Sequence, residues 1–225
     1  MSDNQREPSL ALLGNLLPIG SILSWLEPLV NLWKMLRKAL RGMADEGMYE
    51  VLAYESTLEL LDPRGERAQV RKYERVRYLQ NHIVAYQDEA WGDGEILINY
   101  HCTPGIPVDR YRPGKKTHIL ISLREVKNRG DTDEFHIEWE MRNGFRRATE
   151  LWEAQINHRM NQFKIQVIFP QSRPPRKAAL IEGATRRAHP LGPETCRQLP
   201  DGRWQVYWET NRPRLHETYS LQWEW

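Results

Sequence analysis

From Tyr49 to the C-terminus, apolar and polar residues alternate in short runs that are separated by turn residues. The run FHIEWEM at residues 135–141 is typical, because every second residue is large and apolar. A period of two predicts strands with one buried face. About ten such runs, spaced by turn signals, favour an antiparallel β-sandwich over alternating strands and helices. We therefore expect a mainly β sandwich domain over residues 48–225.

Local turn signals place two hairpins in this domain. Asp62-Pro63-Arg64-Gly65 separates two alternating runs and fits a type I turn, and Asp201-Gly202 separates two later runs. One segment is ambiguous: residues 148–156 fit either two turns of helix or a strand at a sheet edge.

The N-terminal part of the chain has a different pattern. Residues 10–26 carry no charge, but Gly14, Pro18 and Gly20 interrupt them. A transmembrane helix needs about 20 apolar residues with few breaks, so a spanning segment is not expected. We predict a disordered terminus over residues 1–8 and an α-helical arm over residues 9–47.

The second half of the arm, residues 28–41, is amphipathic. Its apolar face comprises Leu29, Leu32, Trp33, Leu36 and Leu40, and its basic face includes Lys34, Arg37 and Lys38. This pattern is typical of a helix in a membrane interface, and equally of a helix that docks on a protein. The expected partner is therefore a membrane surface, another protein or a second copy of the chain.

Charge and cysteine content restrict the setting. The formal net charge is +2, which does not require a nucleic-acid partner, and the two cysteines form no metal-binding or disulfide pattern. A bridge between Cys102 and Cys196 would need neighbouring strands. We expect a cytoplasmic protein, peripheral to the inner face of the membrane if the arm contacts lipid.

Basic residues gather in the predicted loops, and several could meet at one end of the sandwich. Convergence of their guanidinium groups would form a site for a phosphate-bearing small ligand, with a tyrosine ring to stack on a base. The candidates are Arg110, Tyr111, Arg112, Arg129 and Arg173. The simpler interpretation is a solvated basic surface.

Acidic residues gather in two other segments, 88–95 and 131–134. If both segments lay at one end of the sandwich, their oxygens could chelate calcium. Ordinary turn chemistry explains the same composition, because Asp and Gly are favoured in turns. We therefore predict no metal site and no cofactor.

Two further patterns bear on function. The final segment YSLQWEW places four large apolar side chains on one strand face, which favours core packing over an aromatic ligand platform. No nucleophile elbow, phosphate-binding loop, dinucleotide fingerprint or zinc-protease motif is present in the sequence. The sequence thus favours a non-enzymatic protein.

Several runs carry a family resemblance: YEVLAYESTLELLDPRGERA, AYQDEAWGDGEIL, LISLREVKNRGD and the ending WETNRPRLHETYSLQWEW. Residues 49–225 resemble an uncharacterised bacterial β-sandwich domain that closes on a Y-x-L-x-W-x-W strand. The resemblance implies a sandwich fold and a bacterial source, and it implies no catalytic residues. The order of parts is also similar to that of small bacterial defence effectors, which join a membrane segment to a β sensor for a signalling nucleotide.

Two functional hypotheses follow. The first is a sensor or interaction module of a bacterial signalling or defence system, in which the sandwich recognises a ligand or partner protein and the arm docks. The alternative is a membrane-disrupting effector, whose arm is controlled by a nucleotide-sensing sandwich.

Overall fold

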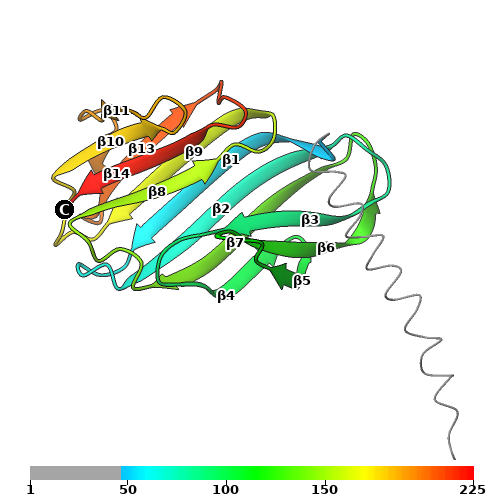
Figure 1. Ribbon diagram of the computed structural model, residues 1–225, viewed down its shortest axis with the longest axis horizontal. Helices are drawn as coiled ribbons and strands as arrows, with labels where there is room; N and C mark the ends of the chain where they lie inside the picture. Colours follow the sequence, from blue (N-terminus) through cyan, green and yellow to red (C-terminus); the bar gives the residue numbers. More distant parts are fainter. Residues whose placement is uncertain (1–46) are drawn as a thin grey trace, which may run out of the picture. The chain divides into compact units, whose positions relative to one another are not determined.

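The computed structural model describes residues 47–225, so the predicted arm lies outside the described residues. Fourteen strands in three sheets make up the regular structure of this part of the chain (Figure 1). The prediction of a mainly β domain is confirmed. Residues 47–225 contain no helix that could cross a membrane.

The largest sheet has seven strands. In spatial order they are β12 (Cys196–Gln198), β13 (Trp204–Thr210), β9 (Met160–Phe169), β1 (Tyr49–Leu60), β2 (Arg67–Tyr78), β7 (Thr132–Arg142) and β4 (Glu95–Thr103). A four-stranded sheet has the order β11 (Arg187–Pro190), β10 (Lys177–Glu182), β14 (Thr218–Glu224) and β8 (Thr149–Gln155). A three-stranded sheet has the order β3 (Ile83–Ala90), β6 (Thr117–Lys127) and β5 (Ile106–Tyr111).

Both smaller sheets cover the same face of the large sheet. Ser56 in β1 is paired directly with Lys72 in β2, so their side chains share a face. Trp152 of β8 donates to Ser56 Oγ at 3.0 Å, and Asp88 of β3 accepts a hydrogen bond from Lys72. The described residues therefore form two layers, and the second layer is interrupted between β8 and β3 (Figure 1).

Aromatic rings fill the space between the layers. Phe163 of β9 lies 5.3 Å from Tyr219 of β14, and Phe135 of β7 stacks on Tyr86 of β3 at 4.0 Å. The large apolar side chains of the final segment are all buried, namely Tyr219, Leu221, Trp223 and Trp225. Their expected role in the core is confirmed.

The expectation of a purely antiparallel fold is wrong in one place, because β1 and β9 pair in parallel over residues 51–59 and 160–168. Turn signals fix an antiparallel arrangement only for strands joined by a short hairpin. These two strands are separated by about a hundred residues, so no turn constrains their relative direction.

Two edge strands lie in segments that show no apolar–polar alternation in the sequence. Residues 103–114 include β5, and residues 186–194 include β11. Both strands lie at a sheet edge and have mostly exposed side chains, so they lack the alternation that reveals a half-buried strand. The ambiguous segment 148–156 forms β8, in agreement with its interpretation as an edge strand.

The two predicted hairpins are present. Gly65 N donates to Asp62 O at 3.3 Å and closes the turn between β1 and β2, and β12 pairs with β13 around Asp201-Gly202. The cysteines are both free, and they lie in β4 and β12, the opposite edges of the seven-stranded sheet. A bridge between them is therefore not possible within this fold.

Trp223 provides a test of the core. Its side chain is 2% exposed, and its indole N–H is buried without a hydrogen-bond partner. We expect Trp223→Ala to lower the free energy of unfolding by about 3–5 kcal/mol. Trp223→Phe should cost less than half of that amount, because the donor that it removes makes no bond.

Urea denaturation of the full chain measures both effects. Trp152→Phe is the matched control, because the Trp152 indole does donate to Ser56. Equal losses for Trp223→Phe and Trp223→Ala would contradict the account of this packing.

Candidate functional site

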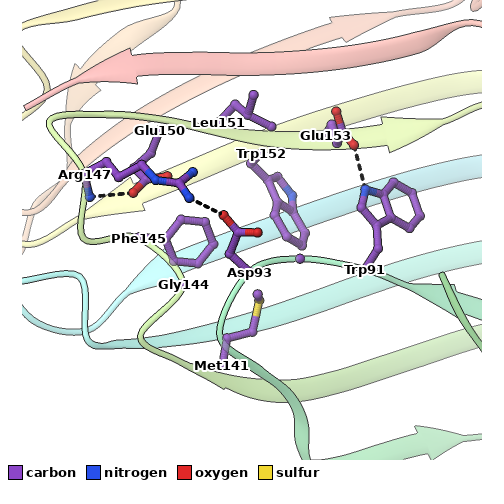
Figure 2. Close-up of a pocket in the computed structure, with 11 residues that line it drawn as sticks. Trp91, Asp93, Met141, Gly144, Phe145, Arg147, Glu150, Leu151, Trp152 and Glu153 are labelled. Carbon is purple, nitrogen blue, oxygen red and sulfur yellow. Dashed lines mark hydrogen bonds and ion pairs between the residues drawn. The ribbon is translucent and has the colours of Figure 1, made fainter. Parts of the chain in front are cut away.

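The interruption between β8 and β3 contains a cleft. Side chains bridge the two edges in place of a backbone ladder: Trp91 Nε1 donates to Glu153 Oε1 at 2.7 Å, and Asn157 Nδ2 donates to Glu89 Oε2 at 3.2 Å. The cleft opens beside the first of these bonds, between β8, the β3–β4 loop and the β7–β8 loop (Figure 2).

The walls of the cleft are mainly apolar. It has a volume of about 210 Å³. Its apolar lining comprises Trp91, Met141, Phe145, Leu151 and Trp152. Binding sites for drug-sized molecules usually have about 300–1,000 Å³, so this cleft fits a group of the size of one amino-acid side chain.

Three carboxylates and one cation line the same cleft: Asp93, Glu150, Glu153 and Arg147. Arg147 forms an ion pair with Asp93 at 3.0 Å, in which both side chains are more than 60% exposed. The backbone N–H of Arg147 also donates to Glu150 Oε1 at 2.6 Å (Figure 2). Burial raises the pKa of the Glu150 carboxyl, since Glu150 is only 8% exposed. With these carboxyls ionised, the cleft has a net negative charge.

Two glycines allow the segments that line the cleft to pack closely against their neighbours. A Cβ at Gly94 would lie 2.2 Å from the carbonyl oxygen of Arg142, and a Cβ at Gly65 would lie 1.8 Å from that of Phe145. Both glycines have a positive φ, of 73° and 68° respectively. Because no side chain intervenes, the β3–β4 loop lies against the end of β7, and Phe145 lies against the first hairpin.

A small chamber of about 20 Å³ lies beside the cleft and shares the walls formed by Trp91, Trp152 and Glu153. Lys72 and Trp139 also line this chamber. The Trp139 indole N–H is buried and has no hydrogen-bond partner among the described residues. The chamber has room for about one water molecule.

An ionic cluster lies next to the chamber. Lys72 pairs with Asp88 and lies 3.8 Å from Glu74, and all three side chains are more than nine-tenths buried. Burial alone would lower the pKa of Lys72, but Asp88, Tyr54 and Glu74 together outweigh it, so this pKa lies above its ordinary value. Burial raises the pKa of Glu74, and Lys72 offsets part of the increase.

The structure places the predicted basic residues in three separate regions. Arg110, Tyr111 and Arg112 lie together at β5, where the Arg110 guanidinium is 5.2 Å from the Tyr100 ring and the Tyr111 hydroxyl donates to Gln87.

Arg129 and Arg173 lie elsewhere. Tyr111 pairs with His118 near the start of β6, whereas Arg129 follows the end of β6 and its N–H donates to Asn81. The Arg173 guanidinium is 3.9 Å from the Trp225 ring and donates to the Pro63 carbonyl oxygen. The predicted single site with all five residues is therefore not assembled.

The two acidic segments also lie apart. Glu95 pairs with Arg142 at the end of β7, whereas Asp131 and Asp133 lie at its beginning. A calcium site that draws on both segments is thus not formed. Asp133 instead accepts hydrogen bonds from Tyr78 and Lys127.

Sequence reasoning missed the cleft and the ionic cluster, although signals for both exist. In β2, Lys72 and Glu74 fall in the same alternating phase as Ala68, Val70 and Val76, which are buried. Charged residues in an apolar phase of period two are a signal for an internal polar site. No comparable signal joins Trp91 to Glu150, because the β3–β4 loop and β8 are far apart in sequence.

The predicted docking residues of the arm lie outside the described residues, and they stay a prediction. They are Leu29, Leu32, Trp33, Lys34, Leu36, Arg37, Lys38 and Leu40.

No protein-family model matches the chain, and no curated protein matches it either. The family resemblance is therefore supported only as a mainly β fold.

Among solved structures, the chain is similar to an M1 zinc metallopeptidase from Deinococcus radiodurans, with 10% identity and a TM-score of 0.46 over 78% of this chain and 42% of that chain. A mutant of that enzyme bound to a Tyr-Ser-Ala substrate gives 10% identity and a TM-score of 0.48, over 78% and 43% of the two chains. The chain spans less than half the length of these proteins. Likeness at this level carries no functional conclusion.

Glu74 gives a pH-dependent prediction. Its pKa in the folded protein is raised above the ordinary value of 4.5, so the folded state keeps the proton to higher pH than the unfolded chain. As pH rises above about 4.5, this group therefore lowers stability until it is ionised in the folded protein.

Glu74→Gln removes that penalty. The stability of the variant relative to the unsubstituted protein should increase as pH rises from 4 to 8, and any constant cost of the amide cancels from this trend. Urea denaturation across this pH range measures the difference. A difference that stays constant with pH would show that Glu74 does not titrate in this way.

Proposed function

We propose that residues 47–225 form a non-enzymatic interaction module, whose cleft between β8 and the β3–β4 loop binds one apolar or aromatic group that carries a positive charge. The observation that carries this proposal is that three aromatic side chains and three carboxylates line one cleft, whose volume is about 210 Å³. The group would be presented by a partner protein, because the cleft has room for little more than a side chain.

The chemistry of the walls favours a cation. Trp91 and Trp152 offer aromatic faces, to which ammonium and guanidinium groups are attracted. Glu150 and Glu153 provide negative charge in partly desolvated positions, where Coulomb interactions are less screened than in water. The same carboxylates oppose a phosphate, so this cleft supports a nucleotide-sensing role less well.

The phenethylammonium ion is a suitable probe, because it joins an aromatic ring to an amine. We expect it to bind with a dissociation constant of roughly 1 mM, and phenylacetate, its anionic counterpart, to bind much more weakly. The readout is the indole N–H signals of Trp91 and Trp152 in NMR spectra of the full chain.

Glu150→Gln keeps the shape of the cleft but removes a charge, and should weaken binding of the cation about fivefold. Asp109→Asn is the matched control, because Asp109 is an exposed carboxylate on β5 outside the cleft. Equal affinity for the cation and the anion, or equal effects of the two substitutions, would overturn the proposal.

The arm adds a second part to the proposal, in which residues 28–41 dock through their apolar face on a membrane surface or a protein. Trp33→Asp with Leu36→Asp in the full chain should reduce cosedimentation with anionic vesicles, or reduce the oligomeric state. Asn31→Asp changes the charge on the polar face and is the control. Unchanged sedimentation and unchanged mass for all variants would remove the arm from this role.

A further inference from the structure

β8 has a free edge at the cleft. It is the terminal strand of the four-stranded sheet, and β14 is the only strand with which it pairs in the described part of the chain. The open side of β8 faces the β3–β4 loop, whose Trp91 side chain donates to Glu153, and the end of β3, whose Glu89 accepts a hydrogen bond from Asn157 just after β8. Such an edge is a template for another strand.

The hydrogen bonds to β14 reveal which residues of β8 point outward. Trp225 N donates to Ala148 O, and Ile156 N donates to Glu217 O. In an antiparallel pair, residues that bond to the neighbour alternate with residues whose N–H and C=O face the other way. The backbone groups of Leu151 and Glu153 therefore face the open edge.

The side chains of β8 follow the same alternation. Glu150, Trp152 and Ala154 are buried, whereas Leu151 and Glu153 are more exposed. A strand added beside β8 would place residues opposite Leu151 and Glu153 with their side chains outward. The residue between them would point inward, on the same side as Trp152 and toward the aromatic walls.

We propose that the cleft captures an extended peptide segment of a partner protein, which pairs with β8 as an added antiparallel strand, inserts one apolar or aromatic side chain and supplies the positive charge from the residues on either side of it. This inference rests on the proposed function and specifies its ligand. The N–H and C=O groups of Leu151 and Glu153 supply the backbone bonds, and the cleft between Trp91, Phe145 and Trp152 takes the inward side chain.

Charge selects the residues on either side of the inserted group. The outward neighbours lie opposite Leu151 and Glu153, near the carboxylates of Glu153 and Asp93. Basic residues at these two positions complement that charge. The pattern is thus basic–aromatic–basic in an extended segment.

The ion pair at the entrance of the cleft can break with little loss of free energy. The ion pair between Arg147 and Asp93 crosses the cleft, and its side chains are 73% and 62% exposed. Exposed ion pairs add little stability, so a peptide that supplies new cations for Asp93 can displace Arg147.

The probe is the blocked peptide acetyl-Thr-Lys-Phe-Lys-Thr-amide, titrated into the full chain with the indole signals of Trp91 and Trp152 as the readout. We expect the peptide to bind at least tenfold more tightly than phenethylammonium. Methylation of both lysine backbone nitrogens should weaken binding at least tenfold, because these nitrogens face β8. Methylation of the phenylalanine nitrogen is the matched control and should change affinity less than threefold.

Substitution of the protein tests the same bonds from the other side. Leu151→Pro removes an N–H that β14 does not use, and proline is tolerated in edge strands, so the variant should fold but lose at least tenfold in peptide affinity. Leu151→Ala removes the side chain and keeps the N–H, and it should bind the peptide nearly as well as the unsubstituted protein.

The outcomes separate this inference from the proposed function. Strand addition is overturned if phenethylammonium binds but the peptide binds no more tightly. It is also overturned if methylation of the lysine nitrogens and methylation of the phenylalanine nitrogen weaken peptide binding equally. In either case the proposal of a cation-binding cleft stands. If neither probe perturbs Trp91 or Trp152, the proposed function fails with it. A dimer of the full chain that the peptide dissociates would assign the edge to a second copy and would also overturn the inference.

Discussion

The buried ion pair between Lys72 and Asp88 is the interaction on which the arrangement of the site depends. It joins β2 in the seven-stranded sheet to β3 in the covering layer, and both side chains are more than nine-tenths buried. Loss of one partner would leave an uncompensated charge in the interior, which is strongly destabilising. The pair therefore holds β3 above β2, while the bond from Trp152 to Ser56 holds β8 above β1. The covering layer stops between these two anchored strands, and the cleft occupies the interruption.

An interrupted layer explains why apolar walls, charged groups and a free strand edge occur together. A continuous sheet would pair the backbone of β8 and would cover Trp91 and Trp152. The break leaves a cleft that Trp91 and Trp152 line, and the seven-stranded sheet contributes Met141 to it. The site is thus a consequence of how the layers are joined.

Particular residues show how far sequence reasoning extends. The first hairpin and the aromatic final strand are predictable, because turn chemistry and alternation are local signals. The parallel pairing of β1 with β9 is not, because it joins segments that no short turn connects. The structure places Arg110, Arg129 and Arg173 in separate regions for a related reason: loops that share a composition need not share an end of the fold. The cleft brings Trp91 of the β3–β4 loop together with Glu150 and Glu153 of β8. Only tertiary packing determines that these residues lie side by side.

The proposed role of β8 requires that the backbone N–H and C=O groups of Leu151 and Glu153 are open to an added peptide strand. Amide hydrogen exchange of the full chain, followed residue by residue by NMR with and without acetyl-Thr-Lys-Phe-Lys-Thr-amide, tests it most directly. We expect fast exchange at Leu151 and Glu153 in the free protein and marked slowing at these two amides in the complex, with little change at Trp152 and Ala154, which already bond to β14. Slow exchange at Leu151 and Glu153 in the free protein, or no slowing when the peptide perturbs Trp91, would contradict it.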